Sequence, residues 1–171
     1  MNKYLKILIH KIYIYGKDID QKVKYGKMRE QYQIPGSFRF NGEGILLYGD
    51  GKIRIGENTY IGSLSTLQVF IGAELLIGDN CTISHNVRMN TQSLVADQDL
   101  SSKSLQTYIG DVIIGDNVWI GANVFINPGV VIGSNAIVGA NSVVTKNIRP
   151  FEIFGGVPAK LMRVKRLDAG T

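Results

Sequence analysis

A six-residue repeat from Ile114 to Arg149 constrains the fold more than any other feature of the sequence. An aliphatic residue opens each of six successive hexads, and asparagine or glycine fills every fourth position. The first positions are Ile114, Ile120, Ile126, Ile132, Val138 and Val144, and the fourth positions are Asn117, Asn123, Gly129, Asn135, Asn141 and Asn147. Because Asn and Gly enter the left-handed backbone region most easily, this column predicts a corner every six residues.

The six-residue period also distinguishes between the folds that the chain could adopt. An α-helix needs apolar residues at spacings of three and four, and an antiparallel sandwich needs turn signals every ~8–12 residues. A six-residue repeat with apolar first positions is typical of a parallel β-helix, in which each coil buries the core of its neighbour. The sequence therefore predicts an all-β fold of stacked coils, with one aliphatic residue of each short strand pointing inward.

The repeat is weaker before residue 90. Hexads open at Ile55, Ile61, Ile71, Ile77 and Ile83, with Met89 next in register. The spacing from Leu67 to Ile71 is four instead of six, so the register slips there. The pattern stops between Thr91 and Val112, in the polar, serine-rich segment TQSLVADQDLSSKSLQTYIGD. A stretch of this length that leaves a regular solenoid is usually functional or disordered, and we expect a loop, 91–112, that projects from the coils.

Composition and cysteine content suit one soluble domain of ordinary size. No apolar run is long enough to span a membrane, and the N-terminal run YLKILIHKIYIY is broken by Lys6, His10 and Lys11 and lacks the cleavage site of a signal peptide. The single cysteine, Cys81, occupies an inward fifth position and is expected to be a buried structural thiol. One cysteine excludes an intrachain disulfide and suits the reducing cytoplasm.

Positive charge gathers at both ends of the chain. Residues 1–34 hold eight Lys and Arg against Asp18, Asp20 and Glu30, which equals the whole net charge of +5. Leu5, Leu8, Ile9 and Ile12 would share one face of a helix, with the lysines elsewhere; the two interpretations are a helix docked on the β-helix and a basic segment on an anionic membrane surface, at the inner face of the membrane. No nucleic-acid recognition motif accompanies the charge.

These features give three segments. Residues 1–44 form the basic N-terminal segment, expected to be helical and to pack on the coils, and residues 45–149 form the β-helix. Residues 150–171 form a C-terminal basic tail.

A second cluster of basic residues lies just after the last coil, and Glu152 is the only acidic residue in the same stretch. The phosphates of a ligand lying along the coils would end there. The members of the cluster are Lys146, Arg149, Lys160, Arg163, Lys165 and Arg166.

The chain resembles the hexapeptide-repeat acyltransferases over roughly residues 45–165, most clearly in IGDNVWIGANVFINPGVVIGSNAIVGANSVVTKNIRPFEIFGGVPAKLMR. It is most similar to the maltose, galactoside and polysaccharide O-acetyltransferase branch. The resemblance implies a left-handed β-helix, a homotrimer, and acetyl-CoA as the acyl donor in a groove between neighbouring subunits. It also implies roles for single residues.

Ala122 and Ala140 would hold the pantetheine arm through their backbone groups. Thr145, Lys146, Lys160 and Arg163 would lie near the nucleotide. Trp119 would line the acceptor pocket, unless it only covers a coil edge.

The sequence departs from the family at the catalytic base. Leu94 stands where the family's histidine is expected, and the only histidine in the coils is His85. In the family a coil is three hexads, so His85, Ala122 and Ala140 are each the third residue of a middle hexad. They share one column if the 91–112 excursion returns to the same face. His85 would then lie at the thioester end of the pantetheine site, where a neutral imidazole can act as general base; alternatively, it is an exposed corner residue. Asp97 or Asp99 could orient the imidazole or bind acceptor hydroxyls, or simply be solvated.

We therefore predict an acetyl-CoA-dependent O-acetyltransferase acting on a hydroxyl of a sugar or surface-polysaccharide precursor. The alternatives are an N-acetyltransferase acting on a nucleotide-linked amino sugar and a non-catalytic β-helix scaffold that has lost its base, as Leu94 suggests. A γ-class carbonic anhydrase needs three histidine ligands for zinc, and the coils contain one, so no metal is expected.

Overall fold

The computed structural model describes residues 2–166, which form two units divided between Ile34 and Pro35. The first unit is helix α1 (Lys3–Tyr32), which confirms the predicted N-terminal helix. Asn2 caps it, because its side-chain oxygen accepts a hydrogen bond from the Tyr4 N–H at 3.1 Å, and Gln33 ends it in the left-handed conformation at φ 50°. No helix within residues 2–166 is long and apolar enough to cross a membrane.

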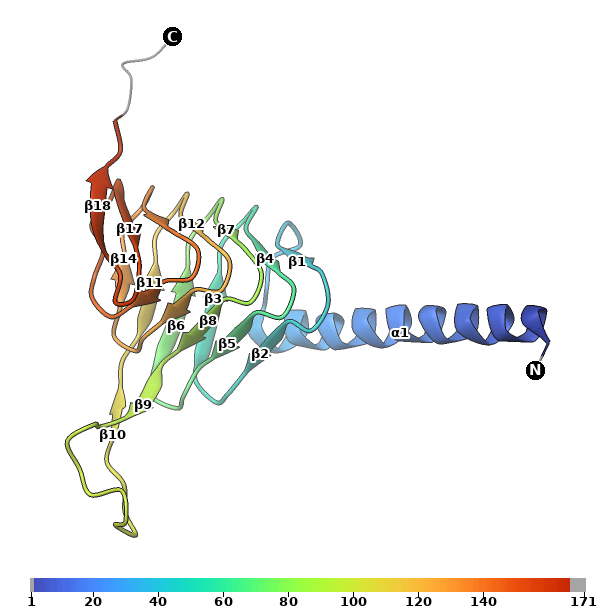
Figure 1. The fold of residues 1–171 in the computed structure, drawn as a ribbon, viewed down its shortest axis with the longest axis horizontal. Helices are drawn as coiled ribbons and strands as arrows, with labels where there is room; N and C mark the ends of the chain where they lie inside the picture. The colour runs from blue at the N-terminus through green and yellow to red at the C-terminus, as the bar shows by residue number, and fades with distance from the viewer. Residues whose placement is uncertain (1, 167–171) are drawn as a thin grey trace. The chain divides into compact units, whose positions relative to one another are not determined.

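The second unit is a left-handed parallel β-helix of about five coils, as the repeat and the resemblance predict (Figure 1). Each coil contributes one short strand to each of three sheets. Sheet one contains β1 (Arg39–Asn41), β4 (Tyr60–Gly62), β7 (Thr82–Ile83), β12 (Trp119–Ile120), β15 (Ile137–Val138), β17 (Glu152–Gly155) and β18 (Lys160–Val164). Sheet two contains β2 (Leu46–Tyr48), β5 (Thr66–Gln68), β8 (Arg88–Asn90), β13 (Phe125–Ile126) and β16 (Val143–Val144). Sheet three contains β3 (Lys52–Ile55), β6 (Glu74–Ile77), β11 (Val112–Ile114) and β14 (Val131–Ile132).

The core is a stack of the first and fifth positions of the repeat. All six first positions from Ile114 to Val144 are at most 2% exposed, and so are the fifth positions from Val118 to Ile148. Cys81 belongs to the fifth positions and is buried, as predicted. Its burial raises the pKa of the thiol, because desolvation disfavours the thiolate.

The corners of the coils lie at the fourth positions of the hexads, with one exception. Asn117, Asn123, Gly129, Asn135 and Asn141 all have φ between 57° and 79°, which confirms the predicted left-handed corners. Asn147 does not have a positive φ. Its side-chain oxygen instead accepts a hydrogen bond from the Val131 N–H of the preceding coil at 2.9 Å, so it satisfies a backbone donor without entering that region.

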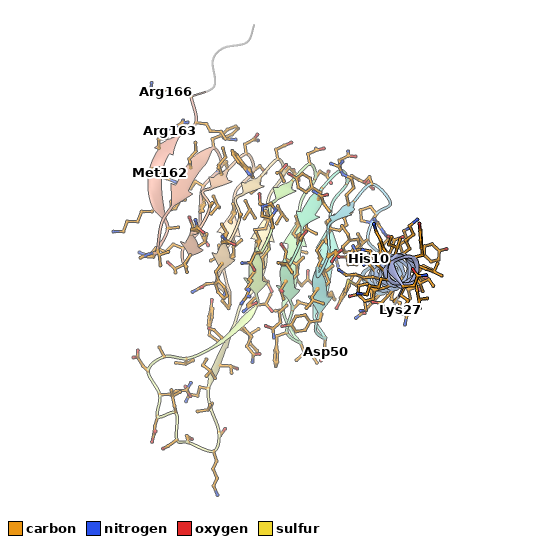
Figure 2. All side chains as sticks on the ribbon, turned by 45° about the vertical axis from the view of Figure 1, so that its right-hand side comes forward. His10, Lys27, Asp50, Met162, Arg163 and Arg166 are labelled. Atoms are coloured by element: carbon orange, nitrogen blue, oxygen red, sulfur yellow. The ribbon has the colours of Figure 1, made fainter. Side chains whose placement is uncertain are left out.

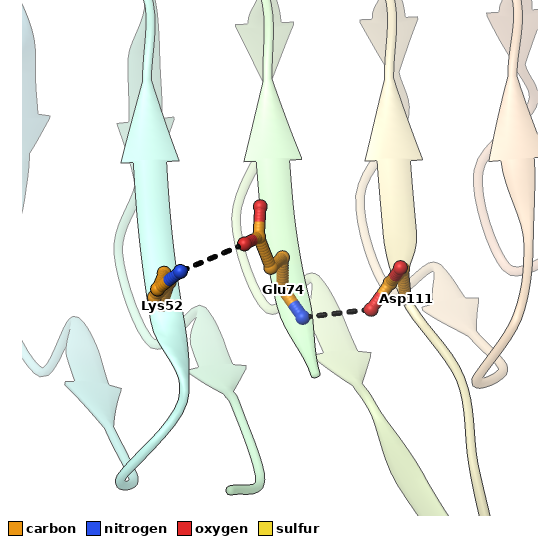
Figure 3. Close-up of polar contacts among 3 residues, drawn as sticks. All are labelled: Lys52, Glu74 and Asp111. Carbon is orange, nitrogen blue, oxygen red and sulfur yellow. Dashed lines mark hydrogen bonds and ion pairs between the residues drawn. The ribbon is translucent and has the colours of Figure 1, made fainter. Parts of the chain in front are cut away.

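Polar side chains also connect successive coils along sheet three. Lys52 Nζ lies 3.3 Å from Glu74 Oε1, and the Glu74 N–H donates to Asp111 Oδ1 at 2.8 Å (Figure 3). Three consecutive coils are thus joined where their strands begin. Because Lys52 is largely exposed, its ion pair adds little stability, whereas the Asp111 bond satisfies a backbone donor.

The register slip near residue 70 differs from the expected one. Ile71, placed at a first position by the sequence, is 63% exposed, while Val69, Ala73, Leu75 and Ile77 are buried. Ten positions separate Leu67 from Ile77, where the repeat has six, so four extra residues widen this corner. Since Ile77 pairs with Ile55 and Ile114, the added residues are absorbed in the corner and the next coil resumes in register.

The coils extend beyond residues 45–149 in both directions. Strand β1 already pairs with β4 in parallel, so the first coil begins before residue 45. After residue 150, β17 pairs with β15 and then turns back against β18. The segment expected to be a tail therefore closes sheet one with a hairpin as far as Val164, and residues 167–171 lie outside the described part of the chain.

The 91–112 excursion projects from the coils, as expected, but it is a hairpin rather than an irregular loop (Figure 1). Strands β9 (Gln92–Leu94) and β10 (Thr107–Ile109) pair in antiparallel register and carry a tip between them. We call residues 92–109 the arm. At its base the Tyr108 ring occupies the space beside Gly129, where an added Cβ would collide with the Tyr108 hydroxyl. The absence of a side chain at Gly129 thus allows the arm to sit against the coil.

Candidate active site

His85, Ala122 and Ala140 lie in one column at the corner between sheets one and two. The Asn123 N–H donates to the His85 carbonyl oxygen at 3.0 Å, and the Asn141 N–H donates to the Ala122 carbonyl oxygen at 2.8 Å. Pairing of Ile120 with Ile83 and Val138 fixes the same alignment. The excursion therefore returns the chain to the same face, and the three residues stack on successive coils about 4.8 Å apart.

The His85 side chain is exposed at this corner and accepts or donates no hydrogen bond within residues 2–166. Ala122 is half-buried and Ala140 is exposed. The column thus presents an imidazole at one position and methyl groups at the next two. Small side chains leave the backbone of the column accessible, which is what an extended amide-bearing ligand requires.

An asparagine ladder, formed by Asn86, Asn123 and Asn141, runs beside the column. Asn86 Nδ2 donates to Asn123 Oδ1 at 2.9 Å, and Asn123 Nδ2 donates to Asn141 Oδ1 at 3.0 Å. The fourth-position pattern predicts these residues as corners but not their linkage. A ladder could have been found by noting that asparagines recur one coil apart. Because Asn86 follows His85 directly in the chain, the hydrogen bonds of the ladder help to fix the backbone that carries the imidazole.

Two basic residues lie at the C-terminal end of this face. Lys160 pairs with Gly155 across the β17–β18 hairpin, and Gly155 lies against Gly139, which precedes Ala140. Lys160 therefore lies beside the end of the His85 column, in line with Gly155 and Gly139. Arg163 pairs with Ile153 on the adjacent part of the hairpin, and both basic side chains are exposed. A ligand lying along the column would meet positive charge at the end opposite His85.

Trp119 lies in a row on the outer face of sheet one. It pairs with Thr82 on one side and with Ile137 on the other, and it is 52% exposed. Further along the row, Tyr60 pairs with Thr82, and the Arg39 guanidinium lies 5.5 Å from the centre of the Tyr60 ring. The same strand carries Trp119 and leads to the corner of Ala122, so the indole lies beside the column.

Thr145 and Lys146 do not join the column within one chain. They follow β16 and therefore lie at the corner between sheets two and three, at the opposite edge of sheet two. Both are exposed. The sequence places them near Ala140 by number, but the width of a sheet separates them in space.

The arm carries the two predicted carboxylates away from His85. It leaves the coils after β8, at the same edge of sheet two as Thr145, and both Asp97 and Asp99 are exposed in its tip. Asp99 Oδ1 accepts the Ser101 N–H at 2.9 Å and the Ser101 hydroxyl at 2.8 Å. These two hydrogen bonds lower the pKa of Asp99, because they stabilise the charged form.

Leu94 ends β9 at the base of the arm and is 51% exposed. It pairs with Thr107, so no titratable side chain occupies its place in the hairpin. Within residues 2–166, no group of three or more His, Cys, Asp and Glu side chains could hold a metal ion.

Two family models match the chain. The bacterial transferase hexapeptide model (six repeats) matches residues 111–146, and the hexapeptide repeat of succinyl-transferase matches residues 52–88. No curated protein matches the chain significantly in sequence. The first matched range contains Trp119, Ala122 and Ala140, and the second contains His85.

Solved structures extend this likeness over most of the chain. A hexapeptide-repeat-containing acetyltransferase from Vibrio cholerae, complexed with acetyl-coenzyme A, is 30% identical with a TM-score of 0.68 over 85% of this chain and 78% of that one. A galactoside acetyltransferase in complex with coenzyme A is 35% identical with a TM-score of 0.62, over 74% of this chain and 65% of that one, so the chain spans less than two thirds of its length. A maltose O-acetyltransferase from Clostridium difficile is 28% identical with a TM-score of 0.61, over 86% of this chain and 78% of that one.

Proposed function

The chain belongs to the hexapeptide-repeat acyltransferases, and from this premise we propose that it transfers an acetyl group from acetyl-CoA to a hydroxyl of a sugar or surface-polysaccharide precursor. The observation that carries the proposal is the column of His85, Ala122 and Ala140, with Lys160 beside its C-terminal end. It offers a base, a run of accessible backbone and a positive end, in the order in which acetyl-CoA presents its thioester, pantetheine and phosphates.

The column suits an extended acyl-CoA. Backbone groups at Ala122 and Ala140 would bind the pantetheine amides, and Lys160 and Arg163 would bind the phosphates through charge-assisted hydrogen bonds. Trp119 beside the column would provide an apolar surface for the acceptor, as aromatic side chains often do for the faces of sugar rings.

Thr145 and Lys146 fit the proposal only if a neighbouring subunit supplies them. We take the active unit to be a homotrimer with a site in each groove between subunits. The His85 corner of one chain would then face the Thr145–Lys146 corner and the arm of the next, which would bring Asp97 and Asp99 towards the acceptor. A ring of three such contacts is closed, because each chain uses its two corners once.

Acetyl transfer requires His85 to accept one proton from the acceptor and then to donate it to the leaving sulfur. The acceptor oxygen attacks the thioester carbonyl while the neutral His85 imidazole removes the hydroxyl proton. When the tetrahedral intermediate collapses, the carbon–sulfur bond breaks and the imidazolium returns the proton to the leaving sulfur, which gives an acetyl ester and free coenzyme A.

The test is the acetyl transfer rate of His85→Ala against a panel of acceptors. We expect kcat/KM to fall about 10²–10⁴-fold, because general-base catalysis contributes that much. Binding of coenzyme A should remain, since the variant leaves Ala122, Ala140 and the basic residues Lys160 and Arg163 unchanged. His10→Ala is the matched control, because it removes the only other histidine, lies in α1 and should keep the wild-type rate.

The same experiment distinguishes the alternatives. A preference for nucleotide-linked amino sugars over neutral glycans would replace O-acetylation with N-acetylation at the same site. An equally active His85→Ala variant would exclude His85 as the base. A wild-type protein that binds no coenzyme A would contradict the enzymatic proposal and favour a scaffold.

A further inference from the structure

Residues 3–19 of α1 carry an apolar stripe. Its residues recur at spacings of three, four and seven, which places them on one side of the helix. They are between 44% and 62% exposed, although all are large aliphatic side chains. The stripe consists of Leu5, Leu8, Ile9, Ile12 and Ile19.

Tyrosine side chains lie along the edges of the stripe, and the charged side chains of this segment lie outside it. At about 100° per residue, Tyr4 and Tyr15 fall along one edge and Tyr13 along the other. All three are exposed. No Lys, Asp or His of residues 3–19 falls between these edges, and together stripe and tyrosines cover about half of the helix circumference. Figure 2 looks nearly along this helix, with its side chains radiating around the axis.

The other side of this segment is basic. Lys3, Lys6, Lys11 and Lys17 precede the first acidic residue, Asp18. Asp18 and Asp20 lie 2.7 Å from Lys22 and Lys24, respectively, so local ion pairs neutralise both carboxylates. Residues 3–17 therefore combine an apolar stripe with four lysines and contain no acidic residue.

We propose that residues 3–19 of α1 bind an anionic lipid bilayer, lying in its surface with the stripe among the acyl chains and the lysines at the headgroups. Charge complementarity favours this partner over a second copy of the chain, because anionic headgroups attract the lysines whereas a second basic helix adds charge of the same sign. Gly16 also falls on the side of the helix that carries the stripe, and it offers no side chain there to pack against a second helix. Tyrosines at the edges of the stripe suit the boundary between headgroups and acyl chains.

The test is flotation of the full chain with lipid vesicles, without acetyl-CoA or acceptor, so the result is independent of the proposed enzymatic activity. Vesicles of phosphatidylcholine alone are compared with vesicles containing phosphatidylglycerol. We expect binding to the anionic vesicles to be at least about tenfold stronger, and to weaken as salt is raised. Equal binding to both vesicles, or none to either, would overturn the proposal.

A pair of matched variants tests the stripe itself. Leu8→Gln with Ile12→Gln places two amides in the stripe and should reduce binding at least about tenfold, since two buried aliphatic side chains are lost from the bilayer. Ile7→Gln with Ile14→Gln makes the same chemical change outside the stripe and should reduce binding less than about twofold. Circular dichroism checks that both variants keep the helix. If the two variants bind equally, the stripe is not the membrane surface. If only the stripe variant lowers the molecular mass in lipid-free buffer, the stripe is an interface between copies instead.

Discussion

Single residues define the corners of this β-helix, and at this scale the sequence is most informative. Asparagine and glycine enter the left-handed region at lower cost than other residues, so a column of them marks the turns before any contact is known. Asn147 escapes this rule because its partner, the Val131 N–H, is brought near only when the coil closes. Leu64 shows the converse, since it adopts φ 63° without belonging to the favoured residue types.

A second residue-scale rule explains the Gly-Asp-Asn triplets. The Asp79 and Asp116 carboxylates accept the backbone N–H groups of Glu57 and Asp79, at 2.7 and 2.9 Å. A side chain at Gly56 or Gly78 would collide with these carboxylates. Glycine in one coil thus accommodates the aspartate of the next, a relation between residues 23 and 38 positions apart that the hexad alone does not reveal.

Asn117 provides a direct test of the corner rule, since its φ is 57° and its side chain makes no hydrogen bond within residues 2–166. Replacement by alanine should destabilise the fold by about 1–2 kcal/mol, the usual cost of the left-handed conformation for such a residue. Replacement by glycine should be close to neutral, because glycine adopts this conformation freely. The measurement is the unfolding transition of both variants in denaturant. Equal stabilities would show that the corner is not held by backbone preference.

At the scale of elements, the strands of the coils follow from the repeat, but the two hairpins do not. The repeat places one inward side chain per strand, and burial of these residues determines the register. In the arm, all three residues of β10 are exposed and β9 is at most partly covered, so no alternation of buried and exposed residues marks them. The β17–β18 hairpin is defined by its pairing with β15, a contact across coils that the local sequence does not encode.

The arm tip offers a pH-dependent test of its own structure. Because Ser101 donates two hydrogen bonds to Asp99, the carboxyl pKa lies below its usual range. The contribution of these bonds to ordering the tip is therefore present at neutral pH and is lost as the pH falls through this lowered pKa. Ser101→Ala removes the hydroxyl donor and should raise the pKa towards its usual value, while the backbone donor remains. Carboxyl carbon chemical shifts followed through an NMR titration measure the change. Ser104→Ala, which makes no contact with Asp99, should leave the pKa unaltered, and an equal shift in both variants would contradict the assigned contacts.

For the whole molecule, the alignment of the candidate site was predictable only in part. The column of His85, Ala122 and Ala140 follows from counting three hexads per coil, provided that the arm returns the chain in register, and it does. The position of Thr145 and Lys146 relative to this column depends on which corner each occupies. Their sequence distance from Ala140 is short, yet strand β16 intervenes and carries them to the far edge of sheet two.

This separation makes a quantitative prediction for the proposed trimer. His85→Ala and Lys146→Glu should each be nearly inactive at low acetyl-CoA, the first through loss of the base and the second through weaker donor binding. If every site combines the His85 corner of one subunit with the Lys146 corner of the next, a mixed trimer contains one site without either substitution. Random assembly of equal amounts should then restore about a quarter of the wild-type activity, since three quarters of the trimers are mixed and one site in three is intact. Denaturing the two variants together and refolding them, followed by an acetyl-transfer assay, measures this fraction. Activity no greater than the average of the two separate variants would mean that both residues act within one chain, or that no shared site exists.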